Sequence, residues 1–268
     1  MKNNMNTFDV TVHMIVKNED QFVAYALESV LPFVSHVIIY DTGSTDDTVA
    51  IIERQLASIK KENPDIDIIF NKLSIKDKSE IKELRQRQLE QTQTDWFFLL
   101  DGDEVWPQKQ LFKLLRLTKE LSVNKLAVVN QTHNCVGDVW HILPPNFGKY
   151  QLLGKKGHLN IRLMRRANFQ LQGTYPNESY FYQNQPINIQ DEYLAYCDVW
   201  YLHLSHLIRS SQKEHVFGRR KTIYSKGIEM ANNDLPEVMQ AINFPKRGCH
   251  YEIIAKIYDL MRTFVESK

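Results

Sequence analysis

The first 130 residues alternate between short apolar runs and longer stretches with helical periodicity. Val10–Val16 and His36–Tyr40 are rich in β-branched residues and predict buried strands. Between and after them, apolar residues recur every three or four positions, which predicts helices over Asp20–Leu31 and over Asp46–Ile59. Asp20 in the first, and Asp46 or Asp47 in the second, can cap the helix. The alternation predicts an α/β fold with a mostly parallel sheet and right-handed crossovers.

The same pattern leads to an acidic cluster. A strand (Ile66–Phe70) and a helix (Lys78–Thr92) are expected before Trp96–Leu100, an apolar run typical of a strand buried on both faces. That run ends directly in Asp101-Gly102-Asp103-Glu104, and ligands of open α/β sheets bind at the carboxyl ends of strands. Three neighbouring acids repel one another, so the cluster indicates a bound cation. Taken alone, a solvated acidic turn explains it equally well.

The pattern becomes less regular after residue 130. Glycines, prolines and aromatic residues crowd His133–Gly157, which predicts irregular chain or a β-hairpin. We find no repeat and no linker, so a single domain is expected. The further expected elements are a helix over Pro107–Leu121, strands over Leu126–Asn130, Ile161–Met164, Phe169–Leu171 and Val199–Leu204, and mostly helical chain from Glu214, including Tyr251–Val265.

Composition narrows the class of protein. The 268 residues include 33 basic and 32 acidic side chains, a net charge of +1, which favours neither nucleic acid nor an anionic membrane surface as a partner. No apolar run is long enough to span a bilayer, and Met1–Asn6 lacks the apolar core of a signal peptide. The cysteines, Cys135, Cys197 and Cys249, are too far apart to predict a zinc site or a disulfide framework. These features predict a reduced, cytoplasmic protein.

The motifs of the first half together resemble glycosyltransferase family 2. They are Lys17-Asn18-Glu19, Asp41-Thr42-Gly43-Ser44-Thr45-Asp46-Asp47-Thr48, Asp95-Trp96 and Asp101-Gly102-Asp103-Glu104, in matching order and spacing over about residues 10–130. The resemblance implies a GT-A fold, a nucleotide-sugar donor, a divalent metal and inversion at the anomeric carbon. It also implies that the one domain, 1–268, comprises a nucleotide-sugar-binding half (8–130), an acceptor half (131–212) and C-terminal helices (213–268).

The resemblance assigns the donor-binding residues. Asp41 corresponds to the acid that binds the uracil or ribose, where a carboxylate can accept hydrogen bonds from the base or the ribose hydroxyls. Gly43 allows close approach of the backbone, and Asn18 belongs to the first motif. Arg85 corresponds to an arginine that reaches the nucleotide, although a solvated helix face explains it about as well.

Asp101-Gly102-Asp103 matches the DxD motif of the family. The resemblance implies that Asp103 ligates Mn²⁺ or Mg²⁺ at the diphosphate, and that Asp101 faces the ribose or a metal-bound water. A hard cation on carboxylate oxygens would neutralise the charge that develops on the leaving diphosphate. The resemblance implies that a late histidine completes the metal shell or touches the diphosphate, and His203 is the better candidate here, with His206 as its rival.

Inversion by direct displacement needs a base for the acceptor hydroxyl. Within the family the likeness is greatest to the bacterial branch of lipopolysaccharide-core β-glucosyltransferases, which carries an arginine-rich strand, as in Ile161–Arg166, and then a His-Glu pair. Glu178 matches the Glu of that pair, whereas Asn177 stands where the branch has His. Asp191 and Glu192 are rival candidates for the base.

We therefore expect an inverting, metal-dependent glycosyltransferase of glycan biosynthesis. Its donor would be a nucleotide sugar, with UDP favoured, and its acceptor a glycan, a lipid-linked glycan or a protein. Such an enzyme would work in the cytoplasm or at the inner face of the cell membrane. The alternative is a non-catalytic protein of the same fold that binds nucleotide sugars or carbohydrate. A nucleotidyltransferase fits poorly, because Lys17–Asp20 has no glycine to cradle a triphosphate.

Overall fold

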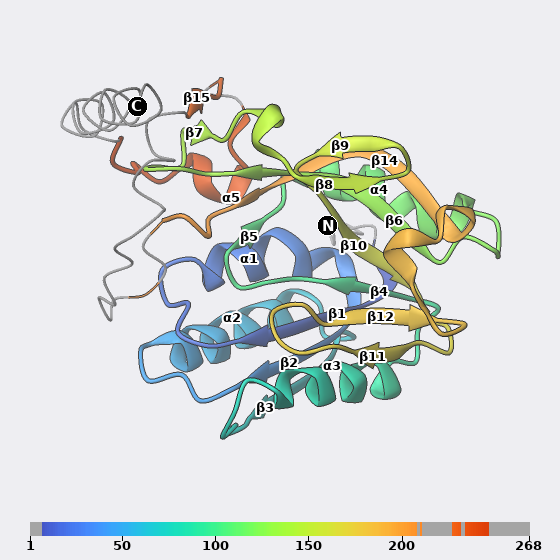
Figure 1. The fold of residues 1–268 in the computed structure, drawn as a ribbon. Helices are drawn as coiled ribbons and strands as arrows, with labels where there is room; N and C mark the ends of the chain where they lie inside the picture. The colour runs from blue at the N-terminus through green and yellow to red at the C-terminus, as the bar shows by residue number, and fades with distance from the viewer. Residues whose placement is uncertain (1–6, 208–209, 211–226, 232–233, 247–268) are drawn as a thin grey trace.

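A computed structural model describes residues 7–207, 210, 227–231 and 234–246. Its centre is an eight-stranded mixed sheet with the strand order β3-β2-β1-β4-β10-β6-β14-β5 (Figure 1). The elements are β1 (Phe8–Val16), α1 (Val23–Val30), η1 (Leu31–Phe33), β2 (Val34–Asp41), α2 (Thr48–Glu62), β3 (Asp67–Lys72), α3 (Glu80–Gln91), β4 (Trp96–Leu99), β5 (Glu104–Val105), α4 (Gln108–Glu120), β6 (Ala127–Asn134), β7 (His141–Ile142), η2 (Pro145–Phe147), β8 (Tyr150–Leu152), β9 (Lys155–Gly157), β10 (Leu159–Arg165), β11 (Gln170–Gln172), β12 (Ser179–Tyr182), β13 (Gln185–Pro186), η3 (Ile187–Ile189), η4 (Asp191–Tyr193), β14 (Leu194–His203), β15 (Ile228–Glu229) and α5 (Glu237–Gln240).

The first four long strands confirm the α/β prediction. β1 pairs in parallel with both β2 and β4, and β2 pairs in parallel with β3. The registers set Val16 beside Asp41, and His13 beside Leu99. The carboxyl ends of β1, β2 and β4 therefore lie together at one edge of the sheet.

One strand from later in the chain runs against this direction. β10 is antiparallel to β4 on one side and to β6 on the other, so it lies between two strands that precede it in sequence. β14 then pairs in parallel with β6, and the two-residue β5 closes the far edge. Because β10 runs backwards, its first residues reach the edge where β1, β2 and β4 end.

Two hydrophobic layers cover the sheet. One face packs against α1, α2 and α4 through residues such as Leu27, Ile52 and Leu114, all fully buried. The other face packs against α3 and the small β11-β12-β13 sheet, where Leu89, Phe97 and Tyr180 belong to one cluster (Figure 1). A third cluster holds the 228–246 segment against α1. The loop between β11 and β12 brings Glu178 to Arg85 of α3.

Some local expectations were wrong. Asp20 does not cap α1, which begins at Val23 with Phe22 at the N-cap position and no side-chain cap. β5, β12 and β13 were not anticipated, because strands of two to four residues carry too little periodicity. Cys135 and Cys197 are buried and form no disulfide. The expected Tyr251–Val265 helix and Cys249 lie outside the described residues, and no helix within the described ranges is long and apolar enough to cross a membrane.

Candidate functional site

The loops that follow β1 and β2 are joined by hydrogen bonds at the sheet edge. Asn18 adopts a left-handed backbone (φ 53°), and its backbone N–H donates to the Ser44 hydroxyl over 2.9 Å. Its side-chain Oδ1 accepts from the Thr45 backbone N–H over 2.8 Å. The hydroxyl of Thr48 accepts from the Glu19 N–H over 2.8 Å. Asn18 thus holds the second loop in place beside the first.

Asp41 organises the loop in which it stands. Its Oδ1 accepts hydrogen bonds of 3.0 Å from the backbone N–H groups of Gly43 and Ser44, and its Oδ2 accepts the Ser44 hydroxyl. Gly43 has φ +96°, a conformation that favours glycine. Asp41 therefore has a structural role in this turn, in addition to the nucleotide contact that the resemblance implies. Asp41 is almost fully buried, and any contact of it with a nucleotide is a proposal.

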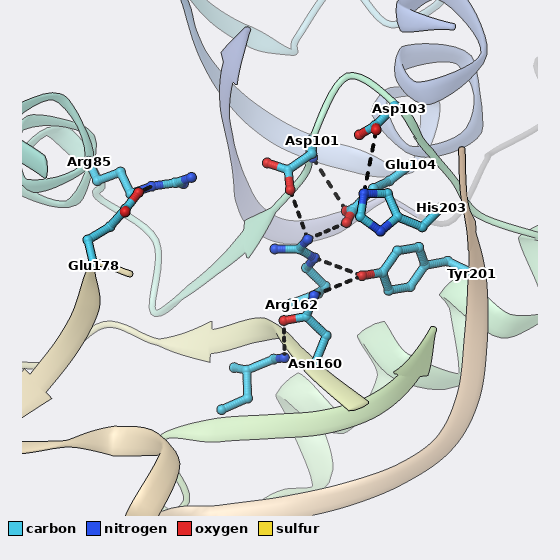
Figure 2. A network of polar contacts seen from close by, with 10 residues as sticks. Arg85, Asp101, Asp103, Glu104, Asn160, Arg162, Glu178, Tyr201 and His203 are labelled. Atoms are coloured by element: carbon cyan, nitrogen blue, oxygen red, sulfur yellow. Dashed lines mark hydrogen bonds and ion pairs between the residues drawn. The ribbon is translucent and has the colours of Figure 1, made fainter. Parts of the chain in front are cut away.

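The three acids after β4 separate into two environments. Arg162, on β10, donates through Nη2 to Oδ2 of Asp101 over 2.8 Å and to Oε1 of Glu104 (Figure 2). Its Nε donates to the Tyr201 hydroxyl over 3.2 Å, which fixes the guanidinium from the other side. Asp101 and Glu104 thus already have a cationic partner, so the cluster is not the uniform cation site that its sequence predicted.

Burial controls the electrostatics of this pair. Glu104 has no exposed surface, and this desolvation raises its pKa to about 7 against the opposing effect of Arg162. Burial alone would lower the pKa of Arg162, but the charge of Glu104 outweighs it and the pKa is raised well above its ordinary value. The buried guanidinium is therefore a permanent positive charge directly beneath the DxD turn.

Asp103 points away from Arg162 and toward His203. His203 Nε2 and Asp103 Oδ2 are 3.5 Å apart, and β14 brings them together because His203 pairs with Glu104 of β5 (Figure 2). Burial alone would lower the pKa of His203, but the Asp103 and Glu104 carboxylates outweigh it and the pKa is raised. His203 thus faces the acid that the DxD motif assigns to the metal.

This arrangement fits a divalent cation with few protein ligands. Asp103, in the turn before β5, offers an oxygen and His203, at the end of β14, offers a nitrogen; both are ligand types that Mn²⁺ accepts. The described ranges contain no group of three or more His, Cys, Asp and Glu residues arranged to hold a metal. Two ligands suffice where a substrate diphosphate and water supply the others, as is usual for Mg²⁺ at phosphates. Asp101 fits less well, because its Oδ2 is already bound by Arg162.

Gly102 lets this turn pack against the loop after β1. A Cβ at this position would lie 3.1 Å from both Cβ and Cγ of Glu19 and 3.2 Å from Val16. The spacing is tighter than ordinary van der Waals contact, so a side chain here would push the DxD turn from its place.

A second ion pair lies on the α3 side of the site. Arg85 Nε donates to Glu178 Oε1 over 3.0 Å, and the two side chains are 19% and 7% exposed. The guanidinium extends from Glu178 toward the side where Asp101 lies (Figure 2). Burial alone would lower the pKa of Arg85, but Tyr180, Asp101 and Glu178 raise it. Arg85 is therefore a buried ion-pair partner and not part of a solvated helix face.

The second carboxylate oxygen of Glu178 is unusual. Oε2 is buried and has no hydrogen-bond partner among the residues that the structure describes. An unsatisfied buried carboxylate oxygen is costly, and such groups occur where a ligand or a reaction uses them. The rivals Asp191 and Glu192 are exposed in η4. Of the sequence candidates for the base, Glu178 alone has this buried environment.

Sequence reasoning missed Arg162 and Tyr201 as members of the site. Arg162 lies 61 positions from Asp101 in the chain, and their contact arises from the antiparallel return of β10. The one available signal was an arginine inside the apolar run Ile161–Met164, since a buried arginine normally has acidic partners. The basic residues Arg219, Arg220 and Lys221 lie outside the described residues.

Comparison with known proteins adds independent information. Residues 11–171 match the family model described as glycosyl transferase family 2. The SPbeta prophage-derived glycosyltransferase SunS of Bacillus subtilis (strain 168) is 28% identical over 116 residues, which are 43% of this chain and 25% of that relative. The chain thus matches only about a quarter of that relative's length. The crystal structure of S. aureus TarS has a TM-score of 0.51 and 12% identity, covering 81% of this chain and 42% of that one.

Proposed function

Because the chain belongs to glycosyl transferase family 2 and has the GT-A fold, we propose that it transfers a sugar from a nucleotide-diphosphate donor to an acceptor hydroxyl. Two pairs of side chains near the carboxyl end of β4 carry the proposal: Asp103 faces His203, and Arg85 forms an ion pair with Glu178. The first pair suits a cation and the second contains a buried carboxylate with an unused oxygen. Displacement at an anomeric carbon needs both: charge stabilisation of the leaving group and removal of a proton from the acceptor.

Asp103 and His203 would hold Mn²⁺ or Mg²⁺ in this proposal. The cation would supply charge stabilisation for the departing diphosphate. Arg162 supports Asp103 indirectly: its one positive charge offsets part of the negative charge of Asp101 and Glu104, which lowers the repulsion among the three acids. The turn can then present Asp103 without the full cost of three adjacent negative charges.

The donor nucleotide would lie against the joined loops. In the proposal Asn18, Asp41 and Gly43 form the surface that meets the base and ribose, and Asp101 faces the ribose. Asp41 and Asn18 fix the loop's shape through their hydrogen bonds, so their contribution is largely preorganisation. Arg85 extends its guanidinium into the space toward Asp101, where it can meet an anionic part of the donor.

Glu178 would act as the base. Arg85 holds Oε1, which orients the carboxylate and leaves Oε2 to accept the proton from the acceptor hydroxyl as that oxygen attacks. Attack from the face opposite the diphosphate inverts the anomeric centre. We further propose a UDP-sugar as donor, and a glycan, lipid-linked glycan or protein as acceptor. We also propose that the enzyme is related to the lipopolysaccharide-core β-glucosyltransferases and takes part in polysaccharide synthesis. It would act in the cytoplasm or at the inner face of the membrane.

Nucleotide binding tests the first half of the proposal. Thermal unfolding is followed with UDP, GDP and ADP, each with Mn²⁺, with Mg²⁺ and with EDTA. At about 100 times its Kd a ligand stabilises the folded state by roughly 2.7 kcal/mol, which is a shift of several degrees for a chain of this size. Asp103→Asn should abolish the metal-dependent shift, while the exposed Asp65→Asn should keep it. If no nucleoside diphosphate stabilises the wild type with either metal, the proposal fails.

Turnover tests the second half. Release of the nucleoside diphosphate from UDP-sugars is measured with candidate acceptors for the wild type and Glu178→Gln. The variant can still accept the Arg85 hydrogen bond, so it should bind UDP normally and lose transfer by several orders of magnitude. Full activity in Glu178→Gln would assign the base elsewhere. Donor binding without any turnover in the wild type would favour a non-catalytic binding protein.

A further inference from the structure

A cavity of about 380 Å³ lies beside the site, beneath the β8–β9 hairpin. Its walls come from the end of β6, from β14, from the start of β10 and from the loop around η2. The volume falls within the range of pockets that bind small ligands. The polar groups of the lining come from Gln131, His133, Lys155, Lys156, His158 and Tyr196.

The cavity lies one strand away from the proposed metal site. His133 pairs in register with Leu202, the residue before His203, so cavity and metal candidate are on neighbouring strands. On the other side, β10 leads from the cavity to Arg162 within a few residues. Alternation along β6 puts Gln131 and His133 on the same face as Val129, whose cluster also contains Tyr180 beside Glu178. An acceptor bound here would lie on the face that carries the proposed base.

The lining of the cavity carries positive charge and no negative charge. Lys155 and Lys156 are exposed at the hairpin, and neither forms an ion pair with any residue that the structure describes. Lys155 Nζ lies 4.5 Å from the centre of the Tyr196 ring, a cation–π contact that holds it over the cavity. The lining contains no Asp or Glu. The neighbouring Asp198 accepts from Gln131 over 2.7 Å and from the Tyr196 hydroxyl over 3.2 Å through one oxygen.

The cavity is built from fixed parts. His158 Nε2 donates to the Pro144 carbonyl over 3.1 Å, which leaves its Nδ1 to accept from Asn134 over 3.0 Å. A Cβ at Gly148 would lie 1.9 Å from the Gly157 carbonyl carbon, so the loop around η2 rests directly on the end of the hairpin. These contacts brace the walls before any ligand arrives, as expected of a preformed site.

Two lining residues, Thr132 and His133, have a buried polar side-chain atom without a hydrogen-bond partner among the described residues. His133 stacks on Trp200 with ring centres 4.4 Å apart, yet its buried Nδ1 has no hydrogen-bond partner within the described residues. Such groups are uncommon in native proteins and call for an explanation. With two lysines that form no ion pair among the described residues, and with the Tyr196 ring, this histidine makes the cavity polar and cationic, unlike a packing defect.

We propose that this cavity binds the acceptor through a sugar that carries an anionic group, either a phosphate or a carboxylate. The inference rests on the proposed function, which it deepens by naming the acceptor class. Lys155 and Lys156 would bind the anionic group, and the wall that contains Tyr196 would meet the sugar ring. A sugar phosphate and a uronic acid share this chemistry, so both belong to the test.

Calorimetric titration with defined probes tests the inference. The probes are glucose, glucose 6-phosphate, glucuronate and inorganic phosphate, each titrated into the UDP-saturated wild type. At least one anionic sugar should bind about tenfold or more tightly than glucose. Lys155→Gln/Lys156→Gln should weaken that binding about tenfold or more, because two charge-assisted contacts are lost. Lys149→Gln, an exposed lysine outside the lining, is the matched control and should change nothing.

The outcomes separate the two proposals. If UDP binds but no anionic sugar binds, or if binding does not depend on Lys155 and Lys156, the cavity inference is wrong while the proposed function stands. Equal affinity for glucose and for the anionic sugars also overturns it. If UDP, GDP and ADP all fail to bind the wild type with either metal, the proposed function itself is refuted. A folding defect in the double variant would appear as a lost UDP response, and the single variants Lys155→Gln and Lys156→Gln then replace it.

Discussion

The buried guanidinium of Arg162 offers the sharpest test of how the site is held together. Arg162→Met keeps most of the side-chain volume but removes the charge that partners Asp101 and Glu104. Glu104 is fully buried, so it would become an uncompensated carboxyl in a site closed to water. Asp101 is about one-third exposed and can be rehydrated, so Glu104 should dominate the loss.

The expected magnitude follows from that burial. Removing one partner of a buried ion pair typically costs 3–5 kcal/mol, or roughly 6–20 °C in Tm for a chain of this size. The pKa of Glu104 is already raised to about 7 with Arg162 present, and losing the cation should raise it further. A carboxyl with a raised folded-state pKa destabilises the protein as pH rises through that pKa. The loss should therefore be smaller at pH 5.5 than at pH 8.

Urea unfolding at both pH values measures the effect. Arg116→Met, on the exposed side of α4, is the matched control and should change stability by less than about 0.5 kcal/mol. The double variant Arg162→Met/Glu104→Gln should recover a large part of the loss, because no unpaired charge remains. If Arg162→Met resembles the control, or if Glu104→Gln adds its own cost to that of Arg162→Met, the ion-pair reasoning is refuted.

Three other perturbations probe neighbouring features. Gly102→Ala should cost about 1–3 kcal/mol in urea unfolding, because its Cβ would press on the Glu19 side chain; an unchanged midpoint would contradict this. Asp41→Ala should lower the free energy of unfolding by about 1–2 kcal/mol and also weaken UDP binding, because the loop loses the acceptor of the Gly43 and Ser44 N–H groups. Weaker UDP binding at unchanged stability would contradict this and would indicate that Asp41 contacts the nucleotide directly. Burial, with Arg85 nearby, lowers the pKa of His13 to about 3. The folded protein therefore resists protonation of His13, and the free energy of unfolding should fall by about 5 kcal/mol as the pH drops from 6.5 to 3. His13→Gln should flatten that slope in acid unfolding, and an unchanged slope would rule His13 out as its source.

The sequence was most informative where structure depends on neighbours in the chain. β1, β2, β3 and β4 each combine an apolar run with a nearby turn signal, and their crossovers restrict the order in which they pair. The error at Asp20 has a local cause as well: α1 begins two residues later than the capping rule suggested, after a turn in which the Glu19 carbonyl accepts from Phe22 and Val23.

Contacts between distant segments could not be predicted in the same way. Arg162 reaches Asp101 only because β10 returns antiparallel beside β4, and nothing in residues 159–165 states which strand will be their partner. Glu178 was chosen by resemblance, but its pairing with Arg85 across 93 positions came from the structure. The different environments of the three acids could not be predicted either. The sequence Asp101-Gly102-Asp103-Glu104 does not show that Arg162 will pair with Asp101 and Glu104 and leave Asp103 to face His203.

The position of β10 also sets the order in which this protein can be completed during synthesis. A ribosome-bound chain that has emerged only as far as β6 contains four parallel strands, but the edge of β4 has no neighbour and β6 has nothing to pair with. Such open edges invite wrong pairings and engage chaperones. Only when residues 159–165 appear can the strand slide between its two earlier neighbours, and the same event delivers Arg162 to the acids. Closure of the sheet and formation of the Arg162 ion pairs with Asp101 and Glu104 are thus one late, long-range step, which should make it a slow phase of folding.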